Sequence, residues 1–499
     1  MILRRPSAHD ARLIAFFLGR VSYVVAVAGA LPAAWAAIAG EWSPFASFTL
    51  MVGVFCILGA LGSSVRHEHE RLGWSQGMVV VALTWLLVPA IGSIPLLLSG
   101  HFGDPLDAFF DAMSGLTTTG LSVIQDLDHL APSLNFWRHL LHFLGGQGIV
   151  LAALSLFAGG AGMTLFYGEG RDERIFPSVT STARFIWAVS IVHLIFGVAL
   201  LTGVGVIAVG LEPLRAVFHG LMIFMAGFDT GGFSPQSTSV GYYHSAAFEA
   251  ATAVLMVAGA MSFGLHFALW RGRRAEVFRN LETRTILATF GVTLVLTIVG
   301  MATLGIYSDV FGLTRQSLFH TLSAHSGTGF STVPSSEIAA WGGLAFGGIA
   351  VAMALGGMAS STAGGVKALR IGLTVKVLRD QVRQVLLPER GIVRRGYYQS
   401  GRRRLTPELA QAVMAVSLLF VAMYLIGAGV GIAYGFSLQS ALFESVSAGA
   451  NVGLSAGITD PSMPTLLQTT YIAEMWLGRL EFVAVFALIG FVVSAVRGK

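Results

Sequence analysis

The sequence is short of charge, of cysteine and of catalytic motifs. Asp, Glu, Lys and Arg make up only 11% of its 499 residues, whereas soluble domains carry about 25%. A chain with so little charge cannot cover a globular surface with polar groups, which excludes a soluble enzyme, a disordered protein and a coiled coil. Cys56 is the only cysteine, so an intrachain disulfide and a cysteine-based metal site are both excluded.

The sequence also lacks the short motifs of common enzyme and nucleotide-binding families. It contains no His-Glu-x-x-His, Gly-x-Ser-x-Gly or Gly-x-x-x-x-Gly-Lys-Ser/Thr pattern, each of which sets chemical groups at the spacing that its reaction or ligand requires. We therefore predict that the protein is not an enzyme and binds no cofactor. Nothing in the chain indicates nucleic acid as a partner.

Long apolar runs dominate what is present. A helix of about 20 mostly apolar residues crosses a bilayer, and a closed barrel would instead show short alternating strands. Ten runs are long enough, near residues 13–40, 44–65, 75–99, 136–161, 184–210, 246–270, 284–306, 339–376, 408–434 and 466–496. The sequence predicts an all-α polytopic membrane protein with ten transmembrane helices.

The basic residues are concentrated on one side of this arrangement. Of the 31 Lys and Arg residues, 26 fall in the two terminal segments and in the loops after the second, fourth, sixth and eighth spans. Cytoplasmic loops carry such an excess, so both termini are predicted to face the cytoplasm. The longest basic stretch, residues 377–406, has two interpretations: a contact with anionic lipid or a docking surface for a regulatory subunit, which we favour.

Four loops on the opposite side share the pattern Gly-[Leu/Phe]-Ser. Their glycines are Gly120, Gly232, Gly329 and Gly453. Each loop follows an apolar stretch of about three helical turns, too short to span, and each lies between two full spans. Phe110, Met222, Phe319 and Phe443 stand ten residues before these glycines.

Repetition at one topological position indicates one structural unit used four times. After two N-terminal helices in residues 1–73, we predict four pseudo-symmetric helix–pore-loop–helix repeats around a central pore. Their predicted bounds are 74–165, 166–275, 276–405 and 406–499.

Four such loops around one axis would direct backbone carbonyls at a central path. Carbonyl rings replace the hydration shell of a potassium ion, and glycine permits the positive φ that turns a carbonyl inward. The half-helices would direct their negative C-terminal ends at the cation. The simpler alternative is that glycine only permits four tight bends.

These loops resemble the filter loops of the Trk/Ktr/HKT superfamily of potassium transporters. Residues 144–149 (Leu-Gly-Gly-Gln-Gly-Ile) and 478–481 (Gly-Arg-Leu-Glu) are similar to that superfamily as well. The two extra N-terminal spans resemble the bacterial Trk membrane subunit. The resemblance implies a potassium-selective subunit of the bacterial inner membrane, a homodimer, regulated by a cytosolic nucleotide-binding ring, with potassium as its substrate. Glycine at all four filter positions goes with potassium in that superfamily.

The resemblance carries over to named residues. The implied potassium-binding filter residues are Thr118, Thr119 and Gly120 in the first loop, Thr230, Gly231 and Gly232 in the second, Gly327, Thr328 and Gly329 in the third, and Asn451, Val452 and Gly453 in the fourth. The implied gate consists of Gly356, Gly357, Ser360, Ser361, Thr362, Gly364, Gly365 and Arg479.

The gate candidates also stand out without the resemblance. Each glycine in a continuous helix costs about 0.8–1.0 kcal/mol relative to alanine, so residues 356–365 predict an interruption below the third filter loop. Close helix packing by small residues is the alternative. Arg479 lies inside the last span, where a charge faces a water-filled path or forms an ion pair. Its candidate partners are Glu474 and Glu481.

One further hypothesis remains open. A secondary transporter coupling potassium to protons or sodium would need a titrating intramembrane carboxylate, for which Glu249, Glu444 and Glu474 are the candidates. A metal site at His139 and His142 is disfavoured, because no third ligand accompanies this pair.

Overall fold

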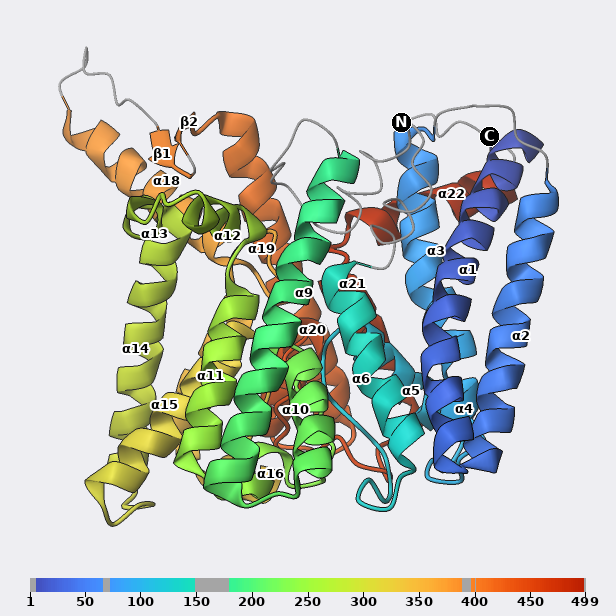
Figure 1. Ribbon diagram of the computed structural model, residues 1–499. Helices are drawn as coiled ribbons and strands as arrows, with labels where there is room; N and C mark the ends of the chain where they lie inside the picture. Colours follow the sequence, from blue (N-terminus) through green and yellow to red (C-terminus); the bar gives the residue numbers. More distant parts are fainter. Residues whose placement is uncertain (1–5, 66–71, 149–178, 388–395, 400, 498–499) are drawn as a thin grey trace.

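The computed structural model describes residues 6–65, 72–148, 179–387, 396–399 and 401–497, and these are predominantly helical (Figure 1). An N-terminal helix pair precedes a four-times repeated order of long helix, half-helix, loop and second helix. The start of α1 and the end of α22 lie at the same end of the bundle (Figure 1). The short helices α12 and α13 and the hairpin of β1 and β2, which belong to the basic loops, lie at this end as well (Figure 1).

The bounds of the elements follow the chain. The N-terminal pair is α1 (Ala8–Ala39) and α2 (Trp42–Ser64). The next group is α3 (Trp74–Gly92), α4 (Ile94–Leu97), α5 (Pro105–Leu116) and α6 (Pro132–Gln147). It is followed by α9 (Val179–Val204), the π-helical η1 (Gly205–Val209), α10 (Pro213–Phe228), the 3-10 helix η2 (Ser239–Tyr243), α11 (Ala246–Ala260), α12 (Phe263–Trp270) and α13 (Ala275–Arg279).

The second half of the chain repeats the order. It contains α14 (Leu281–Thr303), α15 (Val310–Ser326), α16 (Ser335–Ala340), α17 (Gly342–Leu355) and α18 (Ala368–Leu386). The antiparallel hairpin of β1 (Gly396–Tyr398) and β2 (Arg402–Arg404) comes next. The last helices are α19 (Pro407–Ala433), α20 (Leu438–Gly449), α21 (Thr465–Arg479) and α22 (Val483–Arg497).

The four half-helices α5, α10, α15 and α20 are too short to cross a membrane. They have 12, 16, 17 and 12 residues, or about 18–26 Å at 1.5 Å per residue, against a hydrocarbon core of about 30 Å. Side chains cap three of their N-termini: Asp104, Asp309 and Ser437 each accept a backbone hydrogen bond. The half-helices therefore begin at defined residues and end inside the protein.

The chain is a multi-pass membrane protein by length and composition. Six helices of the described part are long and apolar enough to span, or eight if each of two bent pairs counts as one span. The described part of the predicted span 136–161 ends with α6, and residues 149–161 lie outside the described residues. The count of ten and the bounds of the repeats stay predictions.

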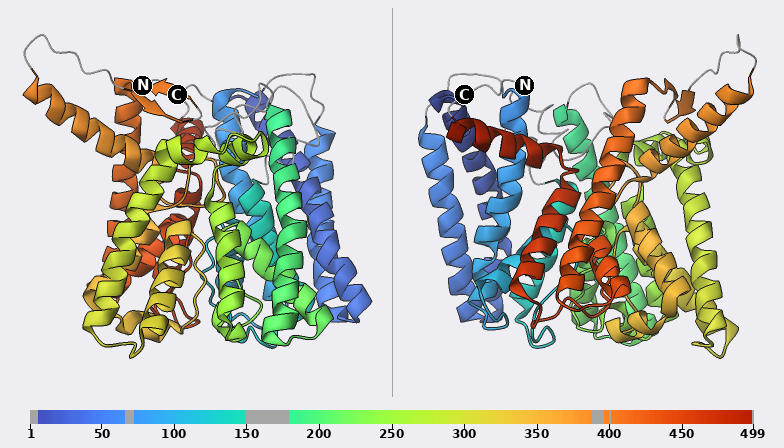
Figure 2. Two further views of the ribbon diagram at one scale, coloured as in Figure 1. Left: turned by 60° about the vertical axis from the view of Figure 1, so that its left-hand side comes forward. Right: turned by 180° about the vertical axis from the view of Figure 1, so that it is seen from behind.

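The spans predicted for 246–270 and 466–496 are bent rather than straight. The angle is 101° between α11 and α12 and 111° between α21 and α22, so α22 lies across the end of the bundle (Figure 2). Ser262 caps the new start of α12, and Glu481 and Phe482 take positive φ values of 51° and 71° at the second bend. An apolar run indicates that a segment is buried in the membrane, but it does not indicate where the helix axis bends. Hydropathy alone therefore predicted continuous helices.

Candidate functional site

The four glycine loops leave their half-helices by the same backbone turn. In each loop the residue two places before the glycine has a positive φ, and the amide after it donates to the carbonyl five residues back at 2.7–2.9 Å. This combination is the Schellman motif that ends a helix. The positive φ values belong to Thr118 (55°), Thr230 (52°), Gly327 (77°) and Asn451 (56°). The loops are thus alike in backbone geometry as well as in sequence.

Each loop glycine lies directly against the backbone of another loop. The glycines have φ between 77° and 97°, and a Cβ atom on any of them would stand closer than 2.5 Å to a carbonyl oxygen. The pairs of glycine and carbonyl are Gly120 with Gly231, Gly232 with Thr328, Gly329 with Val452, and Gly453 with Thr119. The contacts run from the first loop to the second, third and fourth and back to the first, so the loops close into a ring.

This ring collects negative potential at one place. Four half-helices end at it, and the C-terminal end of a helix carries a partial negative charge. Eight of the twelve predicted filter residues are buried, the four loop glycines are partly exposed, and the structure brings all four triplets together. Such a setting of backbone oxygens favours a cation without a hydration shell.

Side chains brace three of the loops from behind. Each of these three half-helices has a polar side chain nine residues before the glycine of the loop that follows it. That side chain forms a hydrogen bond with the serine of the same loop. The pairs are Asp111 with Ser122 (2.5 Å), His320 with Ser331 (3.1 Å) and Glu444 with Ser455 (2.5 Å). The second half-helix has Ile223 at this position. Sequence reasoning missed these braces, although the spacing of 11 residues between the partners repeats.

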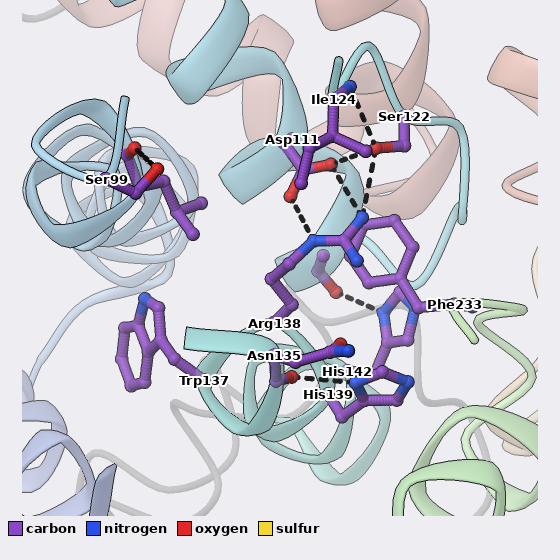
Figure 3. Close-up of polar contacts among 12 residues, drawn as sticks. Ser99, Asp111, Ser122, Ile124, Asn135, Trp137, Arg138, His139, His142 and Phe233 are labelled. Atoms are coloured by element: carbon purple, nitrogen blue, oxygen red, sulfur yellow. Dashed lines mark hydrogen bonds and ion pairs between the residues drawn. The ribbon is translucent and has the colours of Figure 1, made fainter. Parts of the chain in front are cut away.

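A buried network ties the first loop to the second (Figure 3). Arg138 donates to both carboxylate oxygens of Asp111 at 2.7 and 2.9 Å, and to Ser122 Oγ at 3.0 Å. Its guanidinium carbon lies 4.1 Å from the ring centre of Phe233 in the second loop. The side chains of Arg138 and Asp111 are only 1% and 0% exposed, so this pair fixes the loops without competition from water.

His142 makes a second link between the same two loops. Its Nε2 accepts the backbone N–H of Phe233 (3.2 Å), and its Nδ1 therefore donates to the carbonyl of Gly115 (2.6 Å). Both ring nitrogens are thus engaged in hydrogen bonds with the backbone. No group of three metal-ligating side chains occurs among the described residues.

The interrupted segment between α17 and α18, which contains the gate candidates, lies against the half-helix ends. Thr362 Oγ1 donates to the carbonyls of Phe228 (2.9 Å) and Gly259 (2.8 Å). A Cβ atom on Gly364 would stand closer than 2.5 Å to the carbonyl of Ala450, at the end of α20. A Cβ atom added at Gly327 would lie 3.5 Å from the backbone nitrogen of Gly364, so the segment also lies beside the third loop. The segment therefore contacts the second, third and fourth repeats at once.

Arg479 completes the contact with the first repeat. It donates from Nη1 to Thr118 Oγ1 (3.1 Å) and to the carbonyl of Thr362 (2.7 Å), and from Nη2 to the carbonyl of Gly145 (2.8 Å). The arginine thus joins the first glycine loop to the interrupted segment. It is the last residue of α21 rather than the middle of a straight span.

The three candidate carboxylates have different surroundings. Glu249 forms an ion pair with Arg315 (2.6 Å). Glu444 accepts hydrogen bonds from the backbone of Ala456 and Ile458 in the fourth loop, in addition to Ser455. Glu474 is 2% exposed and accepts from Ser445 (2.7 Å), while its Oε2 atom has no hydrogen-bond partner among the described residues.

Glu481, the other predicted partner of Arg479, pairs with Arg370 of α18. This pair connects the bend between α21 and α22 with the helix that follows the interrupted segment.

Comparisons with known proteins identify the family and a similar fold. A family model described as TrkH, a cation transport protein, matches residues 45–492. An uncharacterized cation transporter of Methanocaldococcus jannaschii is 29% identical over 97% of this chain and 96% of its own. The Trk system potassium uptake protein TrkH of Halomonas elongata is 29% identical over 90% of this chain and 92% of its own. The crystal structure of the potassium transporter TrkH from Vibrio parahaemolyticus is 25% identical, with a TM-score of 0.81 over 96% of this chain and 98% of that one.

Proposed function

The chain belongs to the TrkH family of cation transport proteins, and on that premise we propose that it conducts potassium across a cell membrane through the ring of four glycine loops. The observation that carries the proposal is the closed order of contacts, in which each loop glycine lies against a carbonyl of the next loop. Relatives that are named potassium uptake proteins support the choice of ion.

Potassium rather than sodium fits the four glycines. A side chain at any of them would push away a neighbouring carbonyl and change the size and field of the ring. The proposed filter is made of the residues at 118–120, 230–232, 327–329 and 451–453, with the backbone oxygens as ligands.

The segment 356–365 is the proposed gate. It is seated at the ends of the half-helices, and its contacts with Thr118 and Gly145 pass through the Arg479 side chain. Its glycine-rich backbone can take more than one position, which a gate requires. Moving this segment would open the path below the ring.

Rubidium flux into liposomes tests the pore, with Gly120→Ser as the perturbation. We expect the wild type to prefer potassium and rubidium over sodium, and the variant to admit sodium. Gly100→Ser is the matched control, because Gly100 also has a positive φ (78°) but a Cβ atom there meets nothing within 4 Å. An unchanged selectivity in the Gly120 variant would remove the first loop from the filter wall.

A coupled transporter is the second candidate function, and Glu474 is the observation in its favour. A buried carboxylate with one unpaired oxygen is costly, and such groups carry protons in membrane pumps and transporters. Coupling predicts that a proton gradient drives potassium uptake in the wild type and no longer does so in Glu474→Gln. Flux that follows only the potassium gradient in both proteins would favour the channel.

The family membership is also the basis of a proposal about assembly. We propose a homodimer with both termini in the cytoplasm of a bacterial cell, and a cytosolic nucleotide-binding regulatory subunit beneath it. The basic residues near α13, α18 and the hairpin, at the end of the bundle where α1 begins, support this orientation.

A further inference from the structure

A basic groove lies at the end of the bundle where α1 begins. Its volume is about 1050 Å³. Its charged lining residues come from α13, α14, α18 and β2 and are Arg279, Arg284, Lys376, Arg402, Arg403 and Arg404. All six charges are positive, and none of these side chains forms an ion pair among the described residues. Six positive side chains around one groove favour a multiply charged anion.

The groove lies where two helices leave the membrane. Leu281, the first residue of the apolar helix α14, lines it together with Arg284 one turn further on. Arg404 stands three residues before the start of α19 at Pro407. Since α14 and α19 both meet the length and composition of a membrane span, the groove stands at the height of the lipid headgroups.

The hairpin that supplies three of the arginines is firmly packed. Tyr397 and Leu281 pack against the buried side chains of Leu373 and Leu405, and Tyr398 donates to Glu276 of α13 at 2.7 Å. The groove is therefore a formed surface rather than a set of unrestrained side chains. Tyrosine at this height is also typical of the membrane interface.

From these observations we propose that the groove binds the phosphate headgroup of an anionic phospholipid in the cytoplasmic leaflet. Basic pockets between membrane helices on that side bind such headgroups. The arginines can bind phosphate oxygens in pairs, and the apolar surface at Leu281 can meet the acyl chains.

A buried chain of hydrogen bonds connects the hairpin with the segment 356–365. Gln399, 3% exposed, follows β1 and donates to Glu282 Oε2 at 3.2 Å. The other oxygen of Glu282 accepts the backbone N–H of Ala359 at 2.6 Å. The lipid site is thus two side chains away from the proposed gate.

This connection gives the lipid a regulatory effect, which rests on the proposed function of the gate. The hydrogen-bond chain is complete with the segment seated against the half-helix ends. A ligand shifts a protein toward the state that it binds better. A headgroup that holds the hairpin therefore stabilises the seated gate and lowers ion flux.

The binding experiment uses the purified full chain and dioctanoyl phosphatidylglycerol, with dioctanoyl phosphatidylcholine and inorganic phosphate as comparison ligands. The variant is Arg402→Gln, Arg403→Gln and Arg404→Gln together. Each basic residue near a charged surface contributes about a fivefold factor, so we expect about a hundredfold weaker binding of phosphatidylglycerol. The matched control removes three arginines outside the groove, Arg271→Gln, Arg273→Gln and Arg274→Gln, and should bind nearly as the wild type does.

Several results would overturn the site. One is unchanged phosphatidylglycerol binding in the groove variant, or equal losses in the groove variant and the control. Another is displacement of the lipid by inorganic phosphate at equal concentration, which would assign the groove to a soluble anion. Failure of the wild type to bind the lipid at all would assign the charged surface to an acidic protein partner instead.

The flux experiment separates the site from the gate. Rubidium flux of the wild type should be about fivefold lower, or more, in vesicles of phosphatidylcholine with phosphatidylglycerol than in phosphatidylcholine alone. Gln399→Ala should bind the lipid normally and lose this difference. A difference that survives in Gln399→Ala would overturn the proposed connection. If the wild type binds lipid but passes no rubidium in either vesicle, the pore fails while the lipid site stands.

Discussion

Replacing Gly453 with alanine tests the closed ring with a control that the chain itself provides. Gly453 has a φ of 97°, and a Cβ atom there would stand closer than 2.5 Å to the carbonyl oxygen of Thr119. Gly457 lies four residues later with a φ of 92°, but a Cβ atom there would meet only Ser335 Oγ at 3.9 Å. The two alanine variants share the backbone strain and differ in the contact with the ring.

The magnitude follows from these distances. An L-residue at positive φ costs about 1–2 kcal/mol, which applies to both variants. At Gly453 the Thr119 carbonyl must also move by at least 0.5 Å, because Cβ contacts under 3.0 Å essentially never occur. Overpacking of this kind costs about 1–3 kcal/mol. If about 1.4 kcal/mol of this overpacking cost weakens potassium binding, the preference for potassium over sodium drops about tenfold.

The assay is the bi-ionic reversal potential of each variant in planar bilayers or liposomes, together with its melting temperature. Gly453→Ala should lose potassium selectivity, and Gly457→Ala should keep it with a modest loss of stability. Equal selectivity in the two variants would refute the reasoning, because backbone strain alone would then account for both.

Three further predictions concern the gate and the braces. Arg479→Gln should change conductance more than Arg479→Lys does, because lysine keeps the charge beneath the first loop; equal currents would remove that charge from the ion path. Gly364→Ala should raise unregulated rubidium flux by displacing the seated segment, whereas Gly347→Ala, with nothing within 4 Å of its Cβ position, should not. Asp111→Asn leaves Arg138 buried without its ion partner and should cost about 3 kcal/mol or more, which thermal unfolding measures; a neutral result would contradict the bracing role.

The glycine loops could be predicted from the sequence because one short pattern recurs at one topological position. Positive φ was expected at the loop glycines, and the value of 91° at Gly120 confirms it for the first loop. The apolar runs likewise predicted a helical membrane protein. The loop pattern and the apolar runs each lie within a short stretch of neighbouring residues, so a single sequence is enough to detect them.

The braces and the bends could not be predicted with the same rules. Asp111 and Glu444 are single polar residues in apolar half-helices, and their partners lie 11 residues later in irregular loops. Glu282 and Ala359 are 77 residues apart, so nothing in either neighbourhood indicates their hydrogen bond. The bend after Arg479 lies within a continuous apolar run, and hydropathy does not describe the direction of a chain.

The most direct test of the central claim is the position of a bound ion. Crystals of the protein grown with rubidium or thallium in place of potassium would show the ion by its anomalous scattering. The account predicts a peak on the axis of the ring, surrounded by the carbonyl oxygens of residues 119, 231, 328 and 452. An ordered ring without a peak, or a peak only beside Glu474, would contradict it.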